Sequence, residues 1–473
     1  MLNMYHLINL KRVCSIYLDR IIMQQKIFLI GYSSDSGQKS NHSHQSLLDG
    51  FKQLGHNLYI LNESDLHLNK QSVQIKRIFP LKKIEKEISR IKPNLIIILN
   101  NSVIPKNQKV KFNLPIINLI PSESSPLSVL PTIDFKNEHL IVNNYQQYDL
   151  FNKNIQKDNH ENLHILPSFT NNLLTTGSSS ILKHNITFVE PHIETKKIRE
   201  IFAKAVTHHD TTLPSINEVI NKLEIQPNPD LSPTMKDSQL YDFLADCKLP
   251  LIEFEKLLTD HICAEKQTSL IEKLYPLGIS LYGNSKWIHE LLKKPEYLDC
   301  FDANKSIQSI EELQNLYQQS KIVVCDSKHQ FNGALSYRSY DVLSSNALLM
   351  IPYHQDSDVF RVFGKNCIIV MYKNLEHLHE LCLYYLNNEK ERAILVTKCN
   401  KLMENYIQSN DRYRTYLEIV GINIEDNHKY NHGDEEYIKP SVFYRLKKYF
   451  NTNKTLSYIK RKVKGIVRRL SFN

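Results

Sequence analysis

Glycine is scarce in this sequence, with 12 glycines among 473 residues. Loops that bind phosphate through successive backbone N–H groups depend on several glycines placed close together. Neither of the two common patterns, GxGxxG and GxxxxGK[ST], occurs in the chain. The sequence therefore argues against a phosphate site built from a glycine-rich loop.

Membrane spans and cysteine-based sites are also missing. The chain has no run of about 18 or more apolar residues, so no segment is predicted to cross a membrane. Its 8 cysteines form no CxxC pair and no His/Cys cluster at zinc spacing. In a chain of this length they are expected to be reduced thiols, mostly buried, in a cytosolic protein.

Acidic residues are absent near the C-terminus. From Lys439 onward there are 11 Lys or Arg residues and no Asp or Glu. Subtracting these 11 from the 59 Lys and Arg of the chain leaves 48 basic side chains against 50 acidic ones. The formal charge of +9 therefore comes from this segment, and a nucleic-acid-binding body is not expected.

The basic segment has the periodicity of an amphipathic helix. Apolar residues recur every three or four positions from Leu456 to Leu470, and cations fill the positions between them. A helix of this kind is expected at an anionic membrane surface. A solvated helix, a helix that docks on a partner and a nucleic-acid-binding tail are the alternatives. The cations that would face the membrane are Lys460, Arg461, Lys462, Lys464, Arg468 and Arg469.

Short apolar runs alternate with amphipathic helical patterns through most of the chain. The runs at 26–31, 58–61 and 95–99 suit buried strands of a parallel sheet, and a second series begins at 186–189. This alternation predicts an α/β protein with two doubly wound, Rossmann-like domains. We expect a leader at 1–25, within which Met23 is an alternative start. A first domain is expected at about 26–175, a second domain at 176–430 with a helical insertion at about 194–265, and the basic tail at 431–473.

Two doubly wound domains leave a cleft between them. Ligands of such sheets bind outside the carboxyl ends of the strands, where the connecting loops lie. Three loops therefore come into consideration, at 32–44 in the first domain and at 283–287 and 327–338 in the second.

One short motif carries the clearest chemistry. Arg338 and Asp341 are three residues apart on a predicted helix, which places them on one face. A cation and a carboxylate together could hold the diphosphate and the ribose of a nucleotide sugar. The alternative is an ordinary ion pair on the protein surface.

The residues around this motif resemble those of a known family. The C-terminal half is similar to the group 1 glycosyltransferases of the GT-B fold, and most closely to their CgeB-like branch, the spore maturation protein-like glycosyltransferases. Four segments carry the likeness: GISLYGNSKW at 278–287, LYQQSKIVVCDS at 316–327, NGALSYRSYDVLSSNALLM at 332–350, and the terminal helices at 384–420. The first domain matches only in general style.

The resemblance implies a sugar transfer from a nucleotide-sugar donor to an acceptor. The donor would bind to the second domain and a glycan or lipid-linked acceptor to the first, in the synthesis of a cell-surface glycan or glycolipid. It implies no cofactor besides the nucleotide-sugar co-substrate and no metal, because GT-B enzymes stabilise the departing phosphates with cations and helix N-termini. A cytoplasmic enzyme, peripheral on the inner face of the membrane through its tail, is expected.

Residue roles follow from the same resemblance. It places Asp341 on the donor ribose, Arg338 near the diphosphate, and the Gly333 loop near the sugar. The sequence departs from the family pattern at three positions. Asp341 replaces a glutamate. Asn346 replaces a glycine, although asparagine tolerates positive φ next best. Gly333 stands where many retaining relatives carry a glutamate, so the anomeric outcome is open.

Further candidates come from the three loops. His42 and His44, with Asp35 upstream, could supply the base that an inverting mechanism needs, or they could be solvated loop residues. On the donor side, the single tryptophan could stack on a base or sugar, or it could be ordinary packing. The donor-side candidates besides Arg338 and Asp341 are Gly283, Trp287, Lys328, His329, Asn332 and Gly333, of which Lys328 and His329 could also be plain surface charge.

Two other classes of function fit parts of the sequence. A non-catalytic, two-lobed nucleotide-sugar-binding protein, which is a degenerate transferase, would explain the missing glutamate and the scarce glycines. A nucleic-acid-binding protein would rest on the basic tail alone, and its binding would have to be salt-sensitive and lost with residues 439–473.

Overall fold

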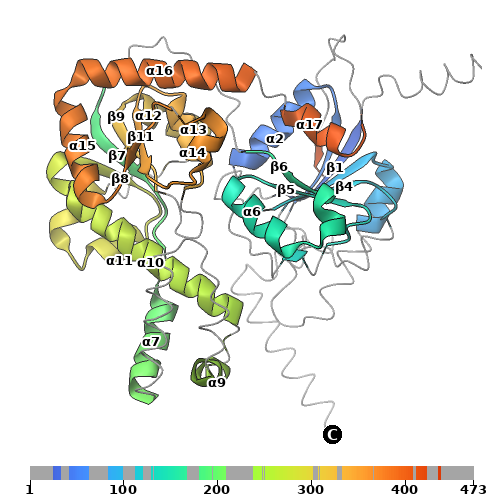
Figure 1. Cartoon of the computed structure of the whole chain (residues 1–473), viewed down its shortest axis with the longest axis horizontal. Helices are drawn as coiled ribbons and strands as arrows, with labels where there is room; N and C mark the ends of the chain where they lie inside the picture. Colours follow the sequence, from blue (N-terminus) through green and yellow to red (C-terminus); the bar gives the residue numbers. More distant parts are fainter. Residues whose placement is uncertain are drawn as a thin grey trace, which may run out of the picture.

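The computed structural model contains two parallel β-sheets with helices packed on them (Figure 1). The expectation of an α/β protein with two doubly wound domains is confirmed. The structure describes residues 25–32, 42–62, 84–99, 112–120, 129–130, 133–167, 181–193, 195–208, 238–247, 249, 251–301, 307, 309–326, 333–365, 367–408, 412–422 and 435–437.

The first sheet has 7 strands in the order β12-β2-β1-β3-β4-β5-β6, and every pair is parallel. Successive side chains of a central strand point to opposite faces of the sheet and therefore pack in different cores. Ile27 and Leu29 pack beneath the helix α2 (His42–Gln53), whereas Phe28 and Ile30 pack against the helical segment 84–91. This is why the strand reads as a continuous apolar run. The strands are β1 (Lys26–Tyr32), β2 (Asn57–Asn62), β3 (Leu95–Leu99), β4 (Ile116–Leu119), β5 (Glu138–Val142), β6 (Leu163–Ile165) and β12 (Glu435–Tyr437).

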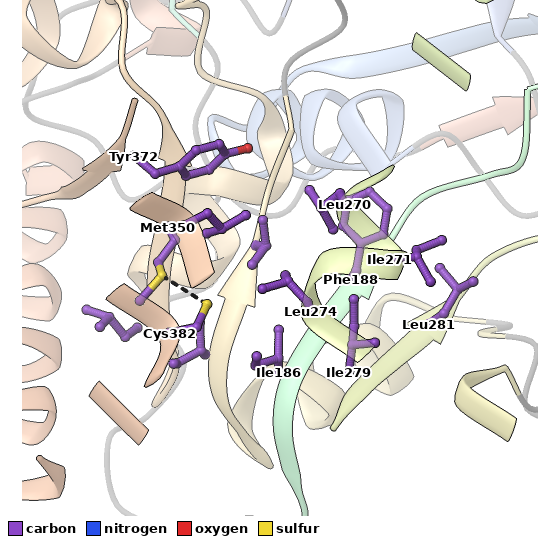
Figure 2. Close-up of a cluster of buried hydrophobic side chains, with 14 of the residues drawn as sticks. Ile186, Phe188, Leu270, Ile271, Leu274, Ile279, Leu281, Met350, Tyr372 and Cys382 are labelled. Carbon is purple, nitrogen blue, oxygen red and sulfur yellow. Dashed lines mark hydrogen bonds between the residues drawn. The ribbon is translucent and has the colours of Figure 1, made fainter. Parts of the chain in front are cut away.

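The second sheet has 5 parallel strands in the order β11-β10-β9-β7-β8. Figure 2 shows the core on one of its faces, where Phe188, Leu274 and Met350 come from separate elements. The thiol of Cys382 lies 3.6 Å from the sulfur of Met350 in this core. The strands are β7 (His184–Val189), β8 (Ile279–Tyr282), β9 (Ser320–Val324), β10 (Leu348–Pro352) and β11 (Val370–Tyr372).

Helices cover both faces of these sheets. In the first domain, α6 (Tyr145–Asn154) follows β5. In the second, short helices follow β8, β9 and β10, and two long ones close the domain. They are α11 (Trp287–Leu291), α12 (Ile310–Gln318), α13 (Tyr337–Leu343), α14 (Asp358–Phe363), α15 (Leu375–Asn387) and α16 (Glu389–Gln408).

The insertion between β7 and β8 is helical in its described part. It contains α7 (Lys196–His208), α9 (Ser238–Asp246) and α10 (Leu251–Leu274). Apolar residues of all three helices form a core of their own, with Phe254 and Leu258 completely buried. Figure 1 shows α7, α9 and one end of α10 projecting from the second domain. The other end of α10 contributes Leu270, Ile271 and Leu274 to the core of the second sheet, beyond the expected limit of the insertion at 265.

The chain returns to the first domain at its C-terminal end. Helix α17 (Arg412–Ile419) buries Tyr416 and Leu417 in the core beneath α2, and β12 extends the first sheet beside β2. The sequence analysis assigned these residues to the second domain and the tail, which is a difference between expectation and structure. The cause is long-range pairing, since β12 joins a strand from near the start of the chain, which no local pattern reveals.

Gly50 of α2 permits the docking of α17. A Cβ at this position would lie less than 3.0 Å from three ring atoms of Tyr413. Gly50→Ala is therefore expected to lower the free energy of unfolding by about 1–3 kcal/mol in urea denaturation, although alanine favours a helix by about 1 kcal/mol over glycine. Adding Tyr413→Ala should remove most of this loss. A neutral or stabilising Gly50→Ala would contradict the observed packing.

Candidate functional site

The carboxyl ends of the two sheets face each other. Asn143, just after β5, donates from Nδ2 to the Tyr337 hydroxyl at 3.2 Å. The backbone N–H of Tyr145 donates to Oδ1 of Asp358, also at 3.2 Å. Because Tyr337 opens α13 and Asp358 opens α14, the loops that follow the strands of the second sheet meet those of the first.

Arg412, which the sequence analysis did not single out, holds a residue of the first domain that contacts the second. It begins α17, is 5% exposed, and donates to Asn143 Oδ1 at 3.0 Å and to the carbonyl of Pro167. Its Nε donates to the Tyr416 hydroxyl at 3.1 Å. Asn143 thus links Arg412 to Tyr337 of the second domain. The only sequence signal for this residue was the likeness of the terminal helices at 384–420.

A pocket lies at the carboxyl edge of the second sheet. It lies between the ends of β9 and β10 and the start of α13, and its empty volume of about 240 Å³ includes space that is open to solvent. Part of it is formed by the loop at 327–338 that the sequence analysis selected. The lining residues are Cys325, Asp326, Gly333, Ala334, Ser336, Ser339, Ile351, Pro352 and Ser357.

Helix α13 holds the Arg338 and Asp341 motif beside this pocket. Ser336 caps the helix by accepting the N–H of Ser339 on its hydroxyl at 3.3 Å. Arg338 forms an ion pair with Glu190, which follows β7, and its side chain is one-third exposed. Asp341 is 3% exposed. An ordinary surface ion pair would leave both side chains solvated, so this alternative does not describe the motif.

Charge and burial act in opposite directions on this cluster. Burial opposes the charged form of Arg338, but the carboxylate of Glu190 outweighs it and raises the pKa of the guanidinium above its ordinary value. Burial also raises the pKa of the neighbouring Cys325 thiol to about 12, even though Arg338 acts in the opposite direction. The thiol is therefore protonated at neutral pH and is no nucleophile.

Gly283 and Trp287 hold Glu190 rather than a ligand. The indole Nε1 of Trp287 donates to the backbone carbonyl of Glu190 at 2.8 Å, and the Glu190 N–H donates to the carbonyl of Tyr282 at 3.0 Å. A Cβ at Gly283 would lie less than 3.0 Å from both the Glu190 carbonyl and the indole ring. Trp287 is completely buried, so its ring has no face open to a base or sugar, and the packing alternative applies.

Gly333 is required at the position where the family resemblance gives many retaining enzymes a glutamate. Its φ is +96°, a conformation that favours glycine. Its carbonyl accepts from the Ser357 hydroxyl at 2.9 Å and from the Asp358 N–H at 2.8 Å, which fixes the loop. A Cβ at this position would lie 3.0–3.1 Å from the side chain of His354. His354 therefore occupies the neighbouring space, a role that the sequence analysis missed.

Asp358 joins the pocket loop to the first domain. Its Oδ2 accepts the N–H of Leu335 at 3.4 Å, while Oδ1 accepts the N–H of Tyr145. Asp358 is 2% exposed, and burial raises its pKa to about 7. Asp358 is also the last residue of an Asp-x-Asp sequence at 356–358. Within the described residues, no group of three His, Cys, Asp or Glu side chains could hold a metal ion.

The remaining predicted residues fall in three groups. His42 and His44 lie in the first turn of α2, so their expected loop position was wrong, and their side chains are outside the described part. Asn346 does not adopt the positive φ expected of it, since the described non-glycine residues with positive φ are Lys92 and Asn113. Asp35, Lys328, His329, Asn332 and the six tail cations, Lys460, Arg461, Lys462, Lys464, Arg468 and Arg469, lie outside the described residues.

Residues 266–418 match the model of a family described as glycosyl transferase-like. This stretch contains Arg338, Asp341 and the pocket. The chain also resembles two solved structures over most of its length. The HepE protein of Anabaena, solved with UDP and glucose, is 10% identical, has a TM-score of 0.52, and the match covers 83% of this chain and 99% of HepE. The trehalose-6-phosphate synthase OtsA is 8% identical with a TM-score of 0.52, and the match covers 85% of this chain and 100% of OtsA.

The chain is a glycosyltransferase with the GT-B fold. No curated protein matches its sequence. Among the described residues, no helix of this glycosyltransferase is both long enough and apolar enough to span a bilayer. The CgeB-like branch stays a prediction.

Proposed function

We propose that this glycosyltransferase takes its sugar from a nucleotide sugar bound at the carboxyl edge of the second sheet. The observation that carries the proposal is the position of Arg338 and Asp341 on α13, a helix that borders the pocket and whose first residue, Tyr337, contacts the first domain. HepE, which shares the fold, was solved with UDP and glucose, which supports a uridine nucleotide as the first donor to test.

The two motif residues suit the two ends of the nucleoside diphosphate. A buried carboxylate such as Asp341 can accept both hydroxyls of a ribose. The bond between the sugar C1 and the diphosphate oxygen breaks with its electrons on the departing phosphate. The acceptor oxygen bonds to C1, and its hydroxyl proton passes to the departing phosphate or to a base. A guanidinium at this position stabilises the negative charge that develops on the departing phosphate.

The first domain would then receive the acceptor. Its loops lie opposite the pocket, and Asn143 and Tyr145 already contact the second domain there. We propose a glycan or lipid-linked acceptor in cell-surface glycan or glycolipid synthesis, reached at the inner face of the membrane through the basic tail. The support for this finer assignment is the sequence of residues 439–473, which combines 11 cations with a periodic apolar face.

Donor binding can be tested by thermal shift with UDP-, GDP-, ADP- and CMP-sugars. One class should raise the melting temperature of the wild type, because a ligand that binds the folded state stabilises it. Arg338→Ala and Asp341→Asn should each weaken that donor by about 10- to 100-fold, the cost of losing one charge-assisted hydrogen bond. Release of nucleoside diphosphate in the presence of the bound donor would then establish turnover.

The control for this experiment is Arg199→Ala. Arg199 lies on α7, 3.6 Å from Glu290 and away from the pocket lining, so its removal should leave donor affinity unchanged. If both motif variants keep the wild-type affinity and circular dichroism shows an intact fold, the donor does not bind at the carboxyl edge of the second sheet. No stabilisation of the wild type by any donor would reject a nucleotide-sugar substrate.

A further inference from the structure

The cation assigned to the donor diphosphate already has an anionic partner. The guanidinium of Arg338 is paired with the carboxylate of Glu190, from the end of a neighbouring strand. The two side chains are 33% and 16% exposed, so the pair lies at the surface of the site and a ligand can reach it. A fully buried pair would need the protein to open before an anion could compete.

The backbone and the side chain of Glu190 are held differently. Its N–H and carbonyl are fixed by Tyr282 and Trp287, and the missing side chain of Gly283 allows this close approach. Its carboxylate, in contrast, has Arg338 as the partner that the structure shows. A rotation about the side-chain bonds alone would therefore release the guanidinium while the strand stays in place.

A hydrogen-bond donor without a partner lies beside this pair. Tyr317, at the end of α12, is completely buried, and its hydroxyl makes no hydrogen bond to any described residue. Burial, the nearby Cys325, and the carboxylates of Asp341 and Glu190 raise its pKa well above the ordinary value, against the effect of Arg338. The hydroxyl is therefore protonated, and a buried donor of this kind is costly unless a partner reaches it.

Two anions compete for one guanidinium in this arrangement. A diphosphate at Arg338 would lie next to the carboxylate of Glu190. Neighbouring negative charges in a partly desolvated site repel each other strongly. The Tyr317 hydroxyl is completely buried while Glu190 is in place, so the phosphate oxygens could accept from it only after the Glu190 side chain has turned away. Displacement of Glu190 would remove the repulsion and satisfy both donors at once.

We propose that Glu190 is a displaceable counter-ion, which holds the Arg338 guanidinium in place and yields it to the donor diphosphate, while the Tyr317 hydroxyl donates to a phosphate oxygen. The inference rests on the proposed nucleotide-sugar site and adds two positioning residues to it. It also gives Gly283 and Trp287 a role, since they fix the backbone from which the carboxylate turns away.

The test measures binding of UDP, GDP and ADP by calorimetry, without any acceptor. Glu190→Gln keeps the shape of the side chain but removes the competing charge, so the affinity for the preferred nucleoside diphosphate should rise about tenfold, equal to about 1.4 kcal/mol. Tyr317→Phe should lower it about five- to tenfold. Glu190→Asp shortens the side chain by one methylene and so draws the carboxylate away from Arg338. It should therefore also raise the affinity for the nucleoside diphosphate.

The matched control is Glu389→Gln. Glu389 is a carboxylate 3.4 Å from the guanidinium of Arg392 on α16, outside the pocket lining, and its removal should leave nucleotide affinity unchanged. If the wild type binds a nucleoside diphosphate but Glu190→Gln binds it equally or more weakly, the counter-ion role is overturned while the donor site stands. If no variant binds any of the three nucleotides, the donor site and this inference fail together.

Discussion

Replacing Gly283 with alanine should lower the free energy of unfolding by at least about 3 kcal/mol, at the upper end of overpacking effects. The new Cβ would lie 2.8 Å from two indole atoms of Trp287 and closer still to the backbone carbonyl of Glu190. The carbonyl cannot move without a shift of the parallel pairing between β7 and β8. Urea denaturation followed by circular dichroism measures the change.

Gly421→Ala separates steric overlap from backbone strain. Gly421 has φ +75°, and no atom lies within 4 Å of the place that a Cβ would take, so alanine there should cost only the left-handed conformation, about 1–2 kcal/mol. Gly283→Ala has no such strain and should still cost more. Equal losses at the two positions would mean that the contact between Gly283, Glu190 and Trp287 is looser than the structure shows.

A pH dependence of stability is expected from Asp358. Its pKa is about 7 in the folded protein because of burial, against about 3.9 for an unfolded chain. Between these values the folded state binds the proton more tightly, so the stabilisation is complete below about pH 4 and is lost as the pH rises to about 7. The difference corresponds to about 4 kcal/mol as an upper limit.

The measurement compares wild type and Asp358→Asn at about pH 5 and about pH 8 in urea. The wild type should lose more stability between the two values than the variant, in which the group cannot titrate. The groups that face Asp358 are the N–H groups of Leu335 and Tyr145, with Arg361 lowering and Asp149 raising its pKa. Identical pH profiles for the two proteins would exclude a buried, titrating carboxyl at this junction of the two domains.

Much of the architecture followed from local patterns. Runs such as 95–99 predicted buried parallel strands because every residue of β3 is apolar and enclosed on both faces. The Arg338 and Asp341 motif pointed to the edge of the second sheet where the pocket lies, since its helix follows a buried strand. The loop at 327–338 could be selected for the same reason.

Other features depended on contacts between distant residues. The partner of Arg338 lies 148 positions earlier in the chain, and nothing near Glu190 distinguishes it from a solvated glutamate. Trp287 reads equally well as a stacking platform or as packing, and only its complete burial decided between them. Arg412 and His354 had no motif of their own, so their positions became visible only when the neighbouring segments were in place.

The sequence by itself determined two α/β domains, the chemistry of one short helix, and the concentration of positive charge beyond Lys439. These are local properties, because strand burial, helical spacing and charge are read from neighbouring residues. The tertiary structure decided which side chains meet: Glu190 with Arg338, Asp358 with the first domain, and α17 with α2. Such pairings bring together segments that are far apart in the chain, and only the folded geometry of both sheets fixes them.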